Sequence, residues 1–232
     1  MTDYLFDTPK VQSIPVKGEA AEYPVHRIFC VGRNYAAHAA EMGVEVDREA
    51  PFYFTKSTQA VLASGSTLPY PPGTDNFHYE MELVLVIGKP VFRASVEDAA
   101  GAIYAYGCGL DMTRRDLQLA ARAKQRPWDL GKDVEGSAVL TGLTKAEEMG
   151  EIGPQRIHLE VNGEVRQDAL LSDLIHGVAE IVADLSKFYH LAPGDVIMTG
   201  TPAGVGPVVA GDRIEGQIDG LAPVTHTLGA AE

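Results

Sequence analysis

One stretch decides how this chain folds: Tyr79-Glu80-Met81-Glu82-Leu83-Val84-Leu85-Val86-Ile87-Gly88. Its apolar run and closing glycine predict a buried β-strand. Side chains alternate across a strand, so Glu80 and Glu82 point to the same face. Two like charges side by side repel each other and are costly to bury, so a cation or several hydrogen-bond donors must offset them. The stretch therefore indicates either a metal site or an edge strand with a solvated acidic face.

Length and composition are those of an ordinary globular protein. The chain has 232 residues, of which 45% are hydrophobic, enough for one large domain or two small ones. A net charge of −13 argues against nucleic acid as a partner, because no basic stripe offsets it. No apolar run is long enough to span a bilayer, and the first residues lack the basic and apolar segments of a secretory signal, so we expect none. Cys30 and Cys108 lie in apolar surroundings and are expected as buried free thiols, so we predict a cytoplasmic protein without a membrane partner.

The segments around the acidic stretch predict an α+β fold that is mainly β. Strands do not alternate regularly with helices, which argues against a doubly wound parallel sheet. Residues 1–25 are expected as an N-terminal arm or short strands, and residues 26–232 as the main domain. Strands are expected at 27–32, 52–55, 195–199 and 213–218, with a hairpin whose type I′ turn is Asn162-Gly163. Helices are expected at 34–42, at 95–104, from Thr113 until Pro127, and at 174–188, the longest.

A third acid, Asp111, follows the apolar run 106–110 and precedes a predicted helix. It could cap that helix, or it could join Glu80 and Glu82. A site of three carboxylates offers only oxygen, which suits Mg²⁺, Mn²⁺ or Ca²⁺ rather than zinc or copper. Three protein ligands would also leave positions free for substrate and water.

Two further pairs of residues share helical faces. Arg115 and Gln118 are three apart and could hold an oxyanion, although solvated surface residues have the same spacing. His38 and Glu41 are also three apart, so Glu41 could orient the imidazole while its other nitrogen takes a proton from water. Such a pair is also common on helix surfaces. Lys132 stands between acids in a predicted flexible loop, where a lysine is usually a surface residue.

Together these segments resemble the fumarylacetoacetate hydrolase family over about residues 26–228. The matching segments are Cys30–Met42, His78–Leu83, Leu110–Gln118, the Lys132 loop, Asn162–Glu164 and Thr199–Gly206. The resemblance implies a mixed β-sandwich roll with a few peripheral helices, a divalent metal and, usually, a homodimer. It also implies that residues 26–232 form a catalytic domain.

The resemblance further implies a role for each matching residue. The metal ligands are Glu80, Glu82 and Asp111; the water-activating pair is His38 and Glu41; Arg115, Gln118 and Lys132 polarise substrate oxygens; and Thr201 contacts the substrate carboxylate. Arg33 is the candidate for binding a second carboxylate of the substrate. Larger members carry a fourth acid seven residues before the histidine, where this chain has Val31. We therefore expect Mg²⁺, or Mn²⁺, rather than a Ca²⁺ site of higher coordination.

The activity that the resemblance implies is hydrolysis of a carbon–carbon bond in an acylpyruvate. Segments such as Tyr23-Pro24-Val25 and Tyr70-Pro71-Pro72 are most similar to the fumarylpyruvate hydrolases of gentisate breakdown, which yield fumarate and pyruvate. Alternatives within the family are an oxaloacetate decarboxylase or acylpyruvase and a 2-hydroxyhepta-2,4-diene-1,7-dioate isomerase. An alternative from another class is a non-catalytic metal-binding β module, which would need only the three acids.

Overall fold

The computed structural model describes residues 3–43 and 50–232. The strands are β1 Ser13–Pro15, β2 Glu22–Pro24, β3 Arg27–Val31, β4 Tyr53–Lys56, β5 Val61–Ala63, β6 Thr67–Pro69, β7 Phe77–Tyr79, β8 Met81–Ile87, β9 Ile103–Asp111, β10 Thr113–Arg114, β11 Ala138–Leu140, β12 Thr144–Lys145, β13 Arg156–Val161, β14 Glu164–Leu170, β15 Asp195–Met198, β16 Gly206–Val208, β17 Arg213–Ile218 and β18 Val224–Gly229. The α-helices are α1 Ala36–Glu41, α2 Val96–Ala100, α3 Arg115–Ala123, α4 Asp129–Lys132, α5 Ala146–Met149 and α6 Val178–Leu185. Two short 3₁₀ turns lie at Thr58–Ala60 and Leu171–Asp173.

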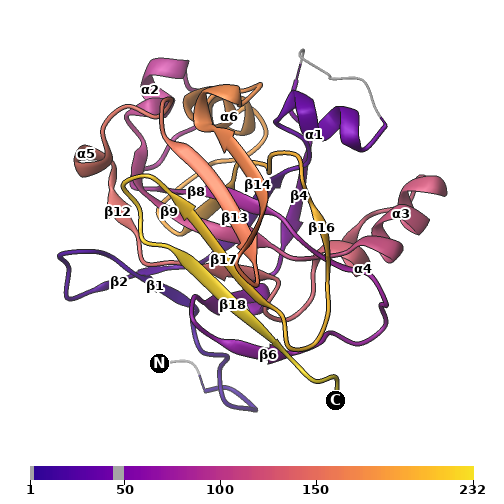
Figure 1. Cartoon of the computed structure of the whole chain (residues 1–232). Coiled ribbons are helices and arrows are strands. Elements are labelled where there is room, and N and C mark those ends of the chain that lie inside the picture. The colour runs from indigo at the N-terminus through magenta and orange to yellow at the C-terminus, as the bar shows by residue number, and fades with distance from the viewer. Residues whose placement is uncertain (1–2, 44–49) are drawn as a thin grey trace.

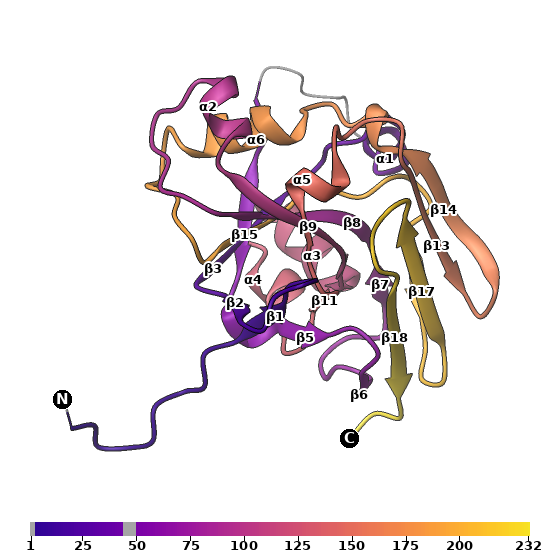
Figure 2. The same ribbon diagram turned by 90° about the vertical axis from the view of Figure 1, so that its left-hand side faces the viewer.

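Strand β8, which carries the acidic stretch, lies inside an eight-stranded sheet of order β4-β3-β15-β8-β9-β11-β5, with β12 paired to β9. All of its residues are buried, as the apolar run predicts. Leu83 and Leu85 face a core shared with the second, five-stranded sheet, β14-β13-β17-β18-β6. Val84 and Val86 face a separate core on the opposite side. The predicted α+β fold, mainly β, is confirmed (Figures 1 and 2).

The N-terminal segment contributes to this separate core. Strands β1 and β2 pair antiparallel, and Ile14 and Tyr23 are buried there with Val84. The Tyr23 hydroxyl donates to the Ile87 carbonyl at 2.8 Å and accepts from the Gly194 amide at 2.6 Å. Residues 3–12 extend away from the body of the molecule (Figure 2). The packing of Tyr23 therefore anchors the short strands to the ends of β8 and β15.

The helices lie at the periphery, as expected for this fold class (Figure 1). Helix α2 packs beside α6, and α3 packs beside α4. No helix in the described part of the chain is both long and apolar enough to cross a membrane. Cys30 and Cys108 are buried and unpaired, as predicted.

Three helix predictions extend too far. The helix expected from Thr113 until Pro127 is α3, which begins only at Arg115, because Thr113 and Arg114 pair with β7 as β10, and which ends at Ala123. The expected helix 95–104 ends at Ala100, because Ile103 already pairs with Ile87 as the start of β9. The expected helix 174–188 is only α6, because the backbone at Leu174 and Ile175 bonds to Tyr35 and Asn34 instead of forming a helical turn. Helix α3 is consequently the longest α-helix within the described residues.

The hairpin prediction is confirmed. Strands β13 and β14 pair antiparallel on either side of Asn162-Gly163. These two residues have φ values of 53° and 79°, the left-handed conformation that a type I′ turn requires at both central positions. The expected strands at 27–32, 52–55, 195–199 and 213–218 correspond to β3, β4, β15 and β17.

Candidate active site

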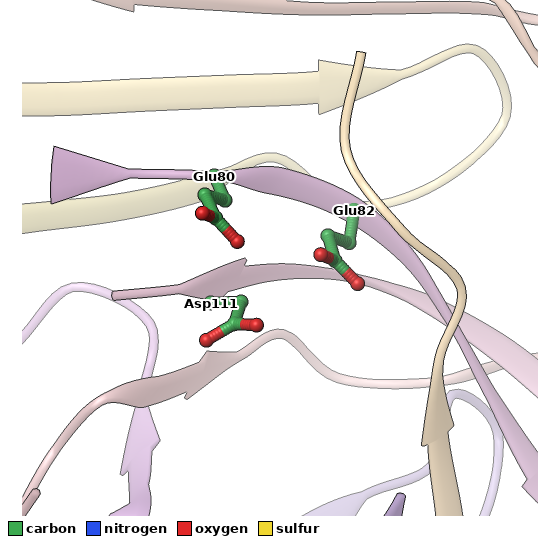
Figure 3. Close-up of side chains that lie close together, drawn as sticks. All are labelled: Glu80, Glu82 and Asp111. Atoms are coloured by element: carbon green, nitrogen blue, oxygen red, sulfur yellow. The ribbon is translucent and has the colours of Figure 1, made fainter. Parts of the chain in front are cut away.

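The three acids predicted as metal ligands lie together at one end of the β8–β9 pair (Figure 3). Glu80 immediately precedes β8, Glu82 belongs to it, and Asp111 ends β9. One carboxylate oxygen from each lies within 4.8 Å of the others, and all three residues are buried. The antiparallel register, which pairs Met81 with Leu110, produces this meeting. The structure thus excludes an edge strand with a solvated acidic face.

Cations surround two of the acids. Glu80 accepts from Arg115 Nη2 on one oxygen and from Lys132 Nζ, at 2.6 Å, on the other. Lys132 Nζ also lies 2.9 Å from Asp111 Oδ2. Burial alone would raise the pKa of Glu80, but the charges of Lys132 and Arg115 outweigh it and hold that pKa well below its usual range. Burial would likewise lower the pKa of the Lys132 ammonium. The negative charges of Asp111 and Glu80 outweigh burial, so that pKa is raised.

The third acid is compensated far less. Glu82 Oε2 accepts from the Gly200 amide at 2.8 Å, and no cation of the described residues forms an ion pair with it. Burial, followed by the charges of Asp111 and Glu80, raises the pKa of Glu82 well above its ordinary value. Asp111 Oδ1 is also buried and accepts no hydrogen bond within the described chain, although a lysine ammonium, that of Lys56, lies 2.9 Å away. A divalent cation between these oxygens would offset the charge of Glu82, so the donor set fits a hard metal ion.

The residue at the position of the possible fourth ligand contributes nothing to this site. Val31 is 2% exposed and belongs to the core between the two sheets. Among the residues that the structure describes, Glu80, Glu82 and Asp111 are the one group of three side chains that could hold a metal ion.

His38 and Glu41 form the contact that their spacing predicts. His38 Nδ1 lies 3.1 Å from Glu41 Oε2 on α1. The Glu41 carboxylate also accepts from the Gly204 amide at 3.1 and 3.2 Å. Burial lowers the pKa of His38 below its ordinary value, although Glu80 and Glu41 oppose the effect. The imidazole is therefore neutral near pH 7, with its Nδ1 proton directed at Glu41 and Nε2 able to accept a proton.

A small cavity brings His38 of the His38–Glu41 pair, called the dyad below, together with Arg115, Gln118 and Lys132, the residues predicted to polarise substrate oxygens. It measures about 20 Å³, room for about one water. Its lining residues are Gly32, Arg33, His38, Met42, Glu80, Arg115, Gln118, Arg122, Trp128 and Lys132. A larger hollow of about 480 Å³ beside it is lined mostly by aromatic side chains and by none of the three acids. The smaller cavity, rather than the larger hollow, is therefore the one at which the predicted catalytic residues meet.

The alternative of a surface location is wrong for three predicted residues. Arg115, Gln118 and Lys132 are 4%, 5% and 2% exposed. Arg115 Nη1 donates to Gln118 Oε1 at 2.5 Å, which aligns both side chains beside Glu80. Lys132 lies on helix α4 rather than in a flexible loop. The backbones of α3 and α4 lie close together, since a Cβ atom at Gly131 would lie 2.8 Å from the Gln118 amide nitrogen. This close packing keeps Gln118 and Lys132 near each other.

The two predicted substrate-contacting residues differ in their placement. Arg33 lines the cavity, and its guanidinium stacks over the Phe52 ring at 4.8 Å. Thr201 is buried in the loop after β15, where its hydroxyl accepts from Gln167 at 2.8 Å. That loop also supplies the Gly200 amide to Glu82. Thr201 is therefore next to the residue whose amide bonds to Glu82 of the acid triad. Its side chain is not among those that line the small cavity.

Sequence reasoning missed Lys56, a third cation beneath the triad. Its side chain is 0% exposed, and Nζ lies 2.9 Å from Asp111 Oδ1. Its protons are directed at the Met112 and Lys132 carbonyls and at Ser137 Oγ. No local signal identifies it, because the acid that it neutralises comes 55 positions later in the chain.

Lys56→Met is expected to destabilise the metal-free protein strongly. Removing one partner of a buried ion pair leaves an uncompensated charge, which costs about 3–5 kcal/mol. Saturating Mn²⁺ is expected to restore part of that loss, since the metal offsets the Asp111 charge. Urea unfolding with and without Mn²⁺ measures both effects, with exposed Lys89→Met as the matched control. Equal stability of the Lys56 variant and the parent would refute this role.

Comparison with known proteins agrees with this geometry. Residues 27–229 match the family described as fumarylacetoacetate (FAA) hydrolase C-terminal. The chain is 55% identical over 194 residues to a fumarylpyruvate hydrolase from a Ralstonia species, covering 82% of this chain and 100% of that protein. It is 38% identical over 213 residues to the oxaloacetate tautomerase YcgM of Escherichia coli K12, covering 91% and 97%.

Solved structures share the fold. The crystal structure of fumarylpyruvate hydrolase from Pseudomonas aeruginosa in complex with Mn²⁺ and pyruvate superposes with a TM-score of 0.94. The two chains are 45% identical, and the match covers 98% of this chain and 100% of the other. This extent of similarity leaves no doubt about ancestry: the chain belongs to the fumarylacetoacetate hydrolase family.

Proposed function

We propose that this protein is a metal-dependent hydrolase that cleaves a carbon–carbon bond in an acylpyruvate, with fumarylpyruvate as substrate and fumarate and pyruvate as products. The observation that carries the proposal is that His38, which contacts Glu41, and Glu80 of the acid triad line one cavity. A non-catalytic metal module would need the acids but not the dyad. The 55% identity to a fumarylpyruvate hydrolase supports the choice of substrate.

His38 acts as the general base in this scheme. Its Nδ1–H is held by Glu41, so Nε2 takes a proton from a water molecule in the cavity. The resulting hydroxide adds to the distal carbonyl carbon of the substrate. The bond between that carbon and the neighbouring methylene then breaks, and its electron pair passes into the pyruvate enolate. The proton held at His38 Nε2 returns to the enolate carbon and completes the reaction.

The buried donors stabilise the charge that develops on oxygen. The cavity presents the Arg115 guanidinium, the Gln118 carboxamide and the Lys132 ammonium, each held by contacts to other residues of the site. Fixed donors in a water-poor site stabilise an oxyanion without having to reorganise. A divalent cation held by Glu80, Glu82 and Asp111 would polarise the carbonyl oxygens of the substrate and hold them in place.

The charge balance of the site supports a dianionic substrate. Three carboxylates face three buried cations, Arg115, Lys132 and Lys56, so their formal charges cancel. A bound divalent cation would leave the site with two positive charges, which a substrate with two carboxylates neutralises. Thr201 is the proposed contact for the pyruvoyl carboxylate, and Arg33 the proposed contact for the fumaryl carboxylate.

The finer properties of the enzyme belong to the same proposal. Mg²⁺ is the proposed physiological metal, with Mn²⁺ and Ca²⁺ as alternatives, because an all-oxygen set of three acids suits small hard cations. The P. aeruginosa relative was solved with Mn²⁺. A homodimer is proposed from the family resemblance. A cytoplasmic location is proposed because the two cysteines are unpaired.

A panel of three substrates tests this function. With Mg²⁺ present, kcat/KM is expected to be highest for fumarylpyruvate, lower for acetylpyruvate, which lacks the second carboxylate, and lowest for oxaloacetate. The measurement follows consumption of each substrate together with the formation of fumarate, acetate and pyruvate. Full activity in metal-free buffer, or no carbon–carbon cleavage of any acylpyruvate, would overturn the proposal.

A second candidate is enol–keto conversion of oxaloacetate, which the 38% identity to YcgM favours. That reaction needs a proton carrier but no water nucleophile, so His38 could serve it as well. Conversion of oxaloacetate without release of CO₂, together with inactivity toward both acylpyruvates, would select this alternative.

A further inference from the structure

Gln167 is buried on a strand whose neighbouring side chains face solvent. It is 1% exposed, whereas Val165, Arg166 and Asp168 are exposed. The pairing of β14 with β13 shifts here: Gln167 pairs with Leu159, but Val165 pairs with the next residue, Glu160. Arg166 is therefore the extra residue of a β-bulge. Gln167, the residue after it, is paired with the buried Leu159 and points to the same inner face. A carboxamide buried in this way needs partners for all of its polar groups.

Its partners belong to the two parts of the proposed site. Gln167 Oε1 accepts from the amide of Met81, the residue between Glu80 and Glu82, at 3.0 Å. Gln167 Nε2 donates to Thr201 Oγ1 and to the Pro202 carbonyl, both at 2.8 Å. The orientation of the carboxamide follows from these partners, since a backbone amide can only donate and a carbonyl can only accept. Gln167 thus bridges the acidic strand and the Thr201 loop.

This orientation determines what the Thr201 hydroxyl can do. A hydroxyl has one proton and can accept two hydrogen bonds. Because Gln167 Nε2 only donates, it occupies an accepting position on Thr201 Oγ1 and leaves the Thr201 proton to be donated elsewhere. A hydroxyl held in this way is a donor suited to a carboxylate oxygen.

We propose that Gln167 is a positioning residue that presents the Thr201 hydroxyl as a hydrogen-bond donor to the carboxylate of a bound α-keto acid. This inference rests on the proposed function, which assigns that carboxylate to Thr201. Gln167 itself does not touch the substrate. Its two contacts hold Thr201 at a set distance from the acidic strand, because the same carboxamide bonds to both.

The bulge also seats the rest of the loop. Gly204 has a φ of 98°, and a Cβ atom there would lie 2.0 Å from the Arg166 carbonyl oxygen. The loop backbone can therefore approach the bulge so closely only through glycine. The Gly204 amide then donates to Glu41 of the dyad. Two adjacent residues of β14 accordingly contact the loop: Gln167 at Thr201, and the bulge residue Arg166 at Gly204, whose amide contacts Glu41.

Binding to the Mn²⁺-loaded protein tests the role of Gln167 without turnover. Two ligands are compared by calorimetry: pyruvate, which has a carboxylate, and acetylacetone, a 1,3-diketone without one. Gln167→Met is expected to weaken pyruvate binding by about tenfold, the effect of one lost hydrogen bond to a charged group. Binding of acetylacetone and of Mn²⁺ itself is expected to stay unchanged. Gln217→Met, on the exposed side of β17, is the matched control.

A double-variant cycle with Thr201→Val separates positioning from a general structural role. If Gln167 acts through the hydroxyl, the double variant binds pyruvate no more weakly than Thr201→Val alone. Gln167→Glu, which keeps the acceptor for the Met81 amide, repeats the cycle if the methionine variant does not fold. Additive losses, or equal losses for acetylacetone, would overturn the role of Gln167. A parent protein that binds neither ligand would instead overturn the proposed function, and this inference with it.

Discussion

Glu82→Gln is expected to weaken Mn²⁺ binding strongly and to remove hydrolysis with it, while making the metal-free protein more stable than the parent at pH 7. The glutamine keeps the shape of the side chain but removes a carboxylate whose pKa is raised by burial and by Asp111 and Glu80. Mn²⁺ affinity is expected to fall by roughly 100-fold or more, since even residues outside the ligand set cost 10–100-fold.

The direction of the stability change follows from the raised pKa. A carboxyl whose folded-state pKa lies above its unfolded value of about 4.3 binds its proton more tightly when folded. The free energy of unfolding therefore falls as pH rises from the unfolded pKa toward the folded one. Glutamine is permanently neutral and does not suffer this loss. The variant and the parent are accordingly expected to converge near pH 4 and to separate at pH 7.

Saturating Mn²⁺ should reverse the order of stability at pH 7. The parent gains about 2.7 kcal/mol at a metal concentration of 100 times Kd, while the variant gains little. Thermal unfolding with and without Mn²⁺ measures the reversal, and Glu97→Gln on exposed α2 is the control. An equal rise in Tm for parent and variant would remove Glu82 from the metal site.

His38→Ala is expected to lower kcat by about 10²–10⁴-fold, the usual contribution of a general base, while leaving Mn²⁺ affinity unchanged. The reason is that His38 forms a hydrogen bond with Glu41, whereas no hydrogen bond or ion pair of the described residues joins it to the three carboxylates. Exposed His26→Ala serves as the control. A His38 variant that hydrolyses fumarylpyruvate at the parent rate would exclude the dyad from the reaction.

The pH profile of the parent provides an independent readout of the same role. The base must be neutral to accept a proton, so kcat/KM falls on the acidic side as His38 becomes protonated. Burial lowers the pKa of His38. Activity is therefore expected to persist below about pH 6.5, the pH at which a free imidazole is half protonated. That acidic limb should be absent from the residual activity of His38→Ala.

Much of this site could be predicted from local sequence, because its elements are built from short-range patterns. Alternation in one strand places Glu80 and Glu82 on the same face, and helical spacing brings His38 to Glu41. Hairpin chemistry at Asn162-Gly163 is equally local. The helix ends were less predictable. Leu174 and Ile175 fit a helical pattern, yet their backbone bonds to Tyr35 and Asn34, which are distant in sequence.

The mainly β fold, the acidic strand, the His38–Glu41 pair and the family follow from the sequence alone, since periodicity and motifs are properties of neighbouring residues. The three-dimensional structure was needed to show that Lys56 lies against Asp111, that Arg115, Gln118 and Lys132 are buried, and that Gln167 bridges Met81 and Thr201. These contacts join residues that are far apart along the chain. Their energies depend on burial and charge compensation, which exist only once the two sheets and the loops have packed together.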